Sequence, residues 1–123
     1  MIDSNSILLF VTDAPKSASF YTRLLGQDPV EASSTFAMFI LPSGLALGLW
    51  GKAGVEPAPA ATGGGCDVGF KVATADMVDT LHAEWQLKGA TILLPPTNFD
   101  FGRTFVAADS DGHRLRVYNV AES

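Results

Sequence analysis

The sequence repeats itself after about half of its length, and no other feature limits the possible folds as strongly. An offset of 61 residues places Leu9 on Phe70, and near the second turn of each copy an offset of 68 places Gly44 on Gly112. Both halves show the same succession of apolar patterns, with one strand, one helix and three further strands. Such a module has to bury one face of its sheet against its helix. The repeat therefore predicts an α+β fold of two tandem βαβββ modules.

Start and stop signals place one helix in each module. Asp13 can accept a hydrogen bond at the start of the first helix, and Gly26 can end it. Thr74 and Gly89 have the same positions around the second helix. The expected strands cover residues 6–12, 28–33, 36–41 and 45–50 in the first module, and 66–73, 90–95, 103–109 and 113–120 in the second.

A linker is expected between the two modules. Residues 52–65 are rich in Gly, Pro and Ala and have no periodicity, which is typical of a linker. The first module is then expected to span residues 5–51 and the second residues 66–120, within a single domain.

The second copy is 7 residues longer than the first, because its offset grows from 61 to 68. We expect the additional residues to form a long loop at residues 95–102. Phe99 and Phe101 could fold over a site from this loop, as a lid does. Arg103 could either anchor the loop by bonding its carbonyls or contact a ligand, and the sequence leaves both open.

Bulk properties exclude several classes of protein. With 123 residues, of which 47% are hydrophobic and 17% charged, the chain is expected to form one folded domain. A formal net charge of −5 without a basic stripe argues against nucleic acid as the partner. No apolar run approaches the roughly 18 residues of a membrane span, and no leader sequence is recognisable. The single cysteine, Cys66, fits a reducing compartment, so a cytoplasmic location is expected.

The final strand carries an unusual row of side chains. Successive residues of a strand point to opposite faces, so Arg114, Arg116 and Tyr118 share one face. The repeat places Gly48 on Arg116 and Trp50 on Tyr118. If both strands face the same cavity, it contains a guanidinium, a phenol and an indole, with space above the glycine. Such a cavity suits a planar aromatic ligand with an acid group.

Two stretches at the ends of the repeat resemble a known superfamily. "LLFVTDAPKSASFYTRLLG" opens the first module and "FGRTFVAADSDGHRLRVY" closes the second. The chain resembles the vicinal oxygen chelate superfamily, which includes glyoxalase I, extradiol dioxygenases, and the fosfomycin- and bleomycin-resistance proteins. The resemblance implies that each module forms a half-barrel sheet and that two modules enclose a concave cavity. In the enzymes of this family, that cavity holds a divalent metal.

The resemblance places the metal-ligand positions at Ser6, Gly48, Asp67 and Arg116. Glycine has no ligating atom, a guanidinium repels a divalent cation, and a serine hydroxyl is a poor ligand. We therefore expect no metal and no cofactor. The resemblance also suggests that Asp67 pairs with Arg116, while Arg114, nearer the turn, is expected to be solvated. The two histidines are expected to be partly exposed residues rather than ligands, namely His82 and His113.

The motifs "LGLWG" and "FGRTF", with "DSDGHRLRV" at the end, are particularly similar to the phenazine-antibiotic resistance proteins. The resemblance implies a dimer that sequesters a flat tricyclic antibiotic without converting it. Family members usually form two-fold dimers with exchanged modules, and the linker is long enough for exchange.

The sequence thus predicts a metal-independent homodimer that binds a flat aromatic small molecule. Trp50 could instead be a core residue, whereas Trp85 is expected in the core. One alternative is an enzyme of the superfamily that uses Asp67, alone or with Tyr118, as a general acid or base without a metal. Another is a structural or regulatory dimer. The predicted ligand-binding residues are Trp50, Gly48, Arg116, Tyr118, Asp67, Ser6, Phe101, Phe99 and Arg103.

Overall fold

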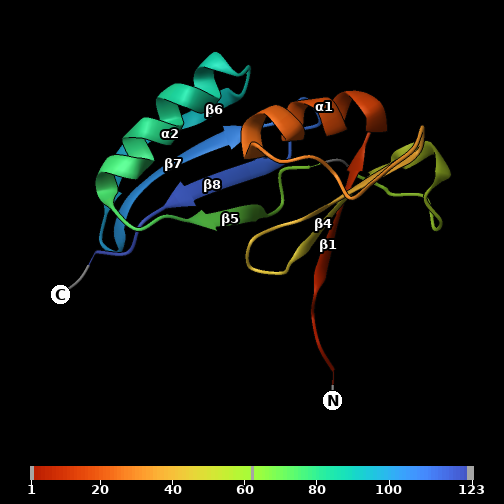
Figure 1. Cartoon of the computed structure of the whole chain (residues 1–123), viewed down its shortest axis with the longest axis horizontal. Coiled ribbons are helices and arrows are strands. Elements are labelled where there is room, and N and C mark those ends of the chain that lie inside the picture. The colour runs from red at the N-terminus through yellow and green to blue at the C-terminus, as the bar shows by residue number, and fades with distance from the viewer. Residues whose placement is uncertain (1, 62, 122–123) are drawn as a thin grey trace. The chain divides into compact units, whose positions relative to one another are not determined.

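A computed structural model describes residues 2–61 and 63–121 of the protein (Figure 1). The chain divides into two compact units, Met1–Thr62 and Gly63–Ser123. Each unit contains one helix on a four-stranded mixed sheet, so the α+β class and the two tandem βαβββ modules are confirmed. Of the expected linker, Thr62 lies outside the described residues. None of the described helices is long and apolar enough to cross a membrane.

The first unit has the strand order β1-β4-β3-β2. The strand β1 is parallel to β4, and the other neighbours are antiparallel. The second expected strand, at residues 28–33, is much shorter than predicted: β2 contains two residues instead of six. The elements are β1 (Ser6–Val11), α1 (Ala14–Leu25), β2 (Glu31–Ala32), β3 (Phe36–Ile40), β4 (Ala46–Gly51) and the 3-10 turn η1 (Lys52–Gly54).

The helix α1 begins and ends at the predicted residues. The carboxylate of Asp13 accepts a hydrogen bond from the backbone N–H of Lys16 at 3.1 Å. At the other end, Gly26 has φ = 69° and donates its N–H to the carbonyl of Thr22. The helix packs on β3 and β4, where the ring of Tyr21 lies 6.4 Å from that of Phe39. Both of these side chains are fully buried.

The second unit has the corresponding order β5-β8-β7-β6, with β5 parallel to β8. Thr74 accepts a hydrogen bond from Met77 at the start of its helix, and Gly89 follows the end with φ = 99°. Figure 1 shows this helix along one face of the sheet, and it packs on β6, β7 and β8. The elements are β5 (Asp67–Lys71), α2 (Ala75–Leu87), β6 (Thr91–Phe99), β7 (Gly102–Ala108) and β8 (Arg114–Tyr118).

Trp85 is in the core of the second unit, as predicted. Its side chain is 3% exposed and makes edge contacts with Phe70 at 5.7 Å and Phe105 at 5.5 Å between ring centroids. Edge-to-face packing of this kind contributes about 0.5–1.5 kcal/mol beyond the burial of area. These rings attach α2 to β5 and β7.

The strand registers confirm the alignment of the two copies. Leu9 pairs with Leu49 in the first sheet, and Phe70 pairs with Val117 in the second. The first partners of these pairs differ by the offset of 61, and the second partners by the offset of 68.

The prediction of a loop and lid at residues 95–102 is wrong. The strand β6 continues through Phe99 and pairs with β7, which begins at Gly102. Two register shifts interrupt this pairing, one of them between Leu94 and Thr97. Because β6 is an edge strand, Pro95 and Pro96 can lie in it without removing a hydrogen bond from a central ladder. The extra residues of the second copy therefore lengthen a hairpin.

Gly102 is a backbone position where a side chain should not fit. Its φ is +150°, and a Cβ would overlap the carbonyl of Asn119. Because backbone strain adds to this overlap, Gly102→Ala should lower the free energy of unfolding by about 3 kcal/mol or more. Urea denaturation measures the change. Gly65→Ala is the control, since a Cβ there would meet nothing within 4 Å; equal stability of the two variants would contradict the prediction.

Candidate functional site

The second sheet has one face packed on α2 and one face without a helix, which we call its open face. On β8, Leu115 and Val117 are fully buried beneath α2. The alternate residues Arg114, Arg116 and Tyr118 are half-buried on the open face. The predicted row of two arginines and a tyrosine therefore lies on one face.

One carboxylate joins both arginines of this row. Asp67 Oδ2 accepts a hydrogen bond from Arg116 Nε at 2.8 Å, and Asp67 Oδ1 lies 2.7 Å from Arg114 Nε. The predicted pair of Asp67 and Arg116 is thus present. Arg114 was expected to be solvated, but it is paired because the parallel register places it directly beside Asp67.

Arg116 is held from a second side by Thr104. Its Nη1 donates to the Thr104 hydroxyl at 3.3 Å, and that hydroxyl donates to the carbonyl of Val117 at 2.9 Å. Thr104 is fully buried. The guanidinium of Arg116 is therefore fixed between a carboxylate and a buried hydroxyl rather than free on the surface.

The pKa of Asp67 is lowered from its ordinary value. Burial by itself raises this pKa, but the hydrogen bond and charge of Arg116, together with Arg114, outweigh it. Asp67 is thus a carboxylate at neutral pH, and it balances one of the two positive charges.

Three aromatic rings lie next to this cluster. Phe101 makes an edge contact with Tyr118 at 6.3 Å and another with Phe99 at 5.8 Å. Phe99 and Phe101 are 45% and 41% exposed, which is unusual for phenylalanine and marks the rings as a surface available for stacking. Phe99 is the last residue of β6, and Phe101 lies in the turn before β7, so neither belongs to a lid.

The open face of the first sheet is apolar. Trp50 is half-buried there and makes an edge contact with Phe10 at 6.4 Å. The space expected above Gly48 is filled, because a Cβ at that position would lie 2.6 Å from Leu8 Cδ2 and 3.2 Å from the ring of Phe36. Ser6 is exposed at the start of β1. Gly48 therefore allows the side chains of Leu8 and Phe36 to pack over the backbone of β4.

Arg103 lies apart from the other predicted site residues. It donates from Nε and Nη2 to Asp79 of α2 at 2.9–3.2 Å, and from Nη1 to Asn98 at 3.0 Å. These contacts place it on the helix side of β7, whereas Thr104 reaches the open face. Arg103 anchors the strand to α2 through side chains instead of anchoring a loop through carbonyls.

The family's metal positions do not fit a divalent cation in this chain. Arg116 is a cation, Gly48 has no side chain, and Asp67 is already bound by two arginines. Within residues 2–61 and 63–121, no three His, Cys, Asp or Glu side chains are grouped so that they could hold a metal. His82 contacts Phe105 on the helix face, and His113, expected to be partly exposed, is buried at the last turn.

Sequence reasoning missed Thr104 and Lys71. Both could have been found from strand alternation, since Lys71 follows Asp67 by four residues on β5 and Thr104 pairs with Tyr118. Leu8 and Phe36, which fill the space at Gly48, gave no such signal.

A surface groove of about 540 Å³ lies elsewhere in the first unit. Its lining consists of small and polar side chains and prolines without an aromatic ring, so it offers nothing on which a flat compound could stack. The lining residues are Pro15, Ala18, Ser19, Thr22, Arg23, Pro29, Ala32 and Ser33.

Comparison with known proteins agrees with this architecture. A sequence model of the Glyoxalase/Bleomycin resistance protein/Dioxygenase superfamily matches residues 4–117, and the chain belongs to this superfamily. The chain is 29% identical over 119 residues to the phenazine antibiotic resistance protein EhpR of Enterobacter agglomerans, covering 94% of this chain and 91% of EhpR. The predicted superfamily is confirmed.

Solved structures have the same fold. Protein ATC0852 from Agrobacterium tumefaciens is 45% identical, with a TM-score of 0.91 over 99% of this chain and 100% of that protein. A glyoxalase-related enzyme from Fulvimarina pelagi is 23% identical, with a TM-score of 0.84 over 97% and 88% of the two chains. The second likeness is one of fold alone.

The shared carboxylate should make stability depend on pH. Because the pKa of Asp67 is lower in the folded state, its contribution is fully present above about pH 4 and is lost as the pH falls through the folded pKa. Asp67→Asn should therefore lower the free energy of unfolding by about 1 kcal/mol at pH 7, and by less at pH 2.5. Urea denaturation at a series of pH values measures this difference.

Asp100→Asn is a suitable control, because it makes the same change of charge in a hairpin turn of the second unit. If Asp67→Asn lowered the free energy of unfolding by the same amount at pH 7 and at pH 2.5, the ion pairs would not be what stabilises the fold.

Proposed function

We propose that this protein is a metal-independent binding protein that captures a flat aromatic small molecule, such as a phenazine, and thereby confers resistance to it. It acts in the cytoplasm as a homodimer, and exchange of modules through the linker remains part of this proposal. The superfamily and a relative named as a phenazine antibiotic resistance protein support a role of the resistance type.

The fixed guanidinium beside aromatic rings is the observation that carries the proposal. Arg116 Nε and Nη1 are held by Asp67 and Thr104, while Nη2 makes no hydrogen bond within the described part of the second unit. Tyr118 follows two residues later on the same face of β8, roughly 7 Å along the strand. A flat ring on Tyr118 could thus present a polar group to Arg116.

The available contacts are strong enough for capture. Stacking on an aromatic side chain contributes about 1–3 kcal/mol, and a charge-assisted hydrogen bond about 1.5–3 kcal/mol. Trp50 with Phe10 offers a second aromatic surface, on the first sheet. With burial of apolar area added, stacking on Tyr118 and a hydrogen bond from Arg116 reach the roughly 8 kcal/mol of micromolar affinity.

The state of Asp67 does not favour the enzymatic alternative. A general base works best when its pKa is close to the working pH. The pKa of Asp67 is lowered, and both carboxylate oxygens are engaged by arginines. Its geometry supports a role in positioning Arg116.

Titration of the purified protein with phenazine-1-carboxylic acid tests the proposal. Tryptophan fluorescence should be quenched saturably with a dissociation constant of about micromolar, and the compound should be recovered unchanged. Tyr118→Ala and Trp50→Ala should each weaken binding about tenfold, since each loses more than about 1.4 kcal/mol of stacking. Calorimetry measures the affinity of Trp50→Ala independently of the lost fluorophore.

Phe20→Ala is a control that removes a half-buried ring from α1, which is a helix and not a strand of the first sheet's open face. Chemical conversion of the compound would favour an enzyme, and no binding of several aromatic acids would overturn the proposal. If Trp50→Ala unfolds the protein while the folded fraction keeps its affinity, Trp50 is a core residue.

Binding should not require a metal. Protein dialysed against EDTA is expected to bind phenazine-1-carboxylic acid as tightly as untreated protein, because the site's donor is a guanidinium. Elemental analysis of untreated protein should find no stoichiometric zinc, iron, manganese or nickel. A tightly bound equivalent whose removal abolished binding would refute metal independence.

A further inference from the structure

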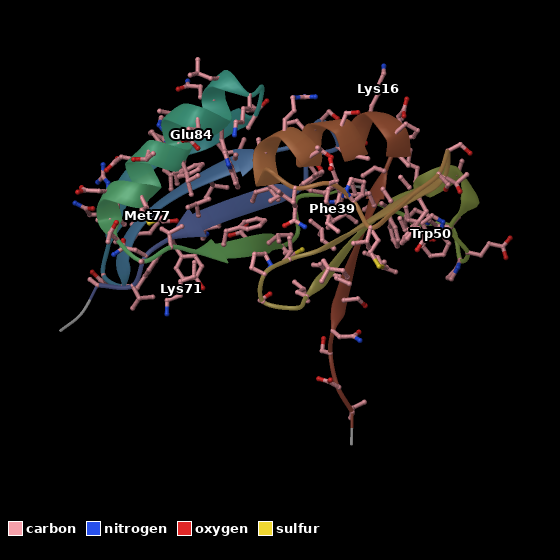
Figure 2. The ribbon with its side chains drawn as sticks, in the orientation of Figure 1. Lys16, Phe39, Trp50, Lys71, Met77 and Glu84 are labelled. Carbon is pink, nitrogen blue, oxygen red and sulfur yellow. The ribbon has the colours of Figure 1, made fainter. Side chains whose placement is uncertain are left out.

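Lys71 places a second cationic group beside Tyr118. It is the last residue of β5 and is paired in register with Tyr118 of β8. Alternation along β5 puts it on the same face as Asp67. Figure 2 shows its side chain extending from β5 on the side away from α2, which is the open face of the second sheet.

The ring of Tyr118 leans over Gly69, a residue of β5 that pairs with Arg116 and precedes Lys71 by two positions. A Cβ at Gly69 would lie 3.4 Å from Tyr118 Cε1, so the ring passes close to the β5 backbone. The phenol ring is therefore flanked by Arg116 along β8 and by Lys71 on the neighbouring strand.

The two cations beside the Tyr118 ring differ in whether an acidic side chain neutralises them. Asp67 engages Arg114 and Arg116, one with each carboxylate oxygen. Lys71 is exposed and has no ion-pair partner within the described part of the second unit. An anion near Tyr118 would thus find the less compensated charge at Lys71.

We propose that Lys71 determines the specificity of this face: its ammonium group contacts the anionic group of an aromatic ligand that stacks on Tyr118. The inference rests on the proposed function and adds the residue that selects planar aromatic acids ionised at neutral pH over neutral ligands. Arg116, whose charge is shared with Asp67, donates to a neutral acceptor of the ring system. The neutral amide of the same ring is bound more weakly, because it cannot form the ion pair.

Calorimetric titration at pH 7 with phenazine-1-carboxylic acid and phenazine-1-carboxamide tests this assignment. The unmodified protein should bind the acid about tenfold more tightly than the amide. Lys71→Gln should weaken binding of the acid about five- to tenfold and change the affinity for the amide less than about twofold. Lys71→Arg should retain most of the preference, since it keeps the charge. Added salt should weaken binding of the acid more in the unmodified protein than in Lys71→Gln.

Lys16→Gln is the matched control. Lys16 is exposed in the first turn of α1, and Figure 2 shows it pointing outward from that helix. The substitution makes the same change of net charge on a helix of the first unit, so both affinities should remain as in the unmodified protein.

The outcomes separate this inference from the proposed function. If the unmodified protein binds both compounds and Lys71→Gln keeps the same ratio of affinities, the assignment of Lys71 is wrong and the capture function stands. If Lys16→Gln reduces the ratio as much as Lys71→Gln, net charge rather than Lys71 sets the preference. If neither compound binds, the proposed function fails, and the assignment fails with it.

Discussion

Packing of one helix on one face of each sheet is the contact on which both modules depend. In the first unit it joins Tyr21 to Phe39, and in the second it joins Trp85 to Phe70 and Phe105. Because side chains alternate along a strand, this burial also decides which residues remain on the open face. The position of Arg116 and Tyr118 is thus a consequence of the core.

The open face of the second sheet carries an ion pair at two positions of the superfamily's metal site. Asp67 and Arg116 occupy two positions at which the superfamily resemblance implies metal ligands, and they bind each other. The carboxylate of Asp67 binds the guanidinium of Arg116 instead of a metal ion. The hydroxyl of Thr104 accepts a hydrogen bond from the other side of this guanidinium. The result is a preorganised hydrogen-bond donor next to aromatic rings.

Where prediction succeeded, a periodic pattern was decisive. The two offsets correctly predicted that the strand pair Leu9–Leu49 of the first sheet corresponds to the pair Phe70–Val117 of the second. They could do so because the register of a strand is set by which of its residues are buried. Prediction failed where a local signal had more than one solution. The seven additional residues of the second copy were expected as a loop, but they extend a hairpin whose edge strand accommodates two prolines. The glycine at position 48 was expected to leave space, but the side chain of Leu8 lies there.

The sequence by itself determined the repeat, the α+β class, the ends of both helices and the row of side chains that shares a face with Arg116. These properties depend on periodicity and on residues near one another in the chain. Only the tertiary structure decided that Arg103 bonds Asp79, that Arg114 shares Asp67, and that the ring of Tyr118 lies over Gly69. Such contacts join strands and helices distant in sequence, and their partners are chosen by register and side-chain reach, which no local pattern contains.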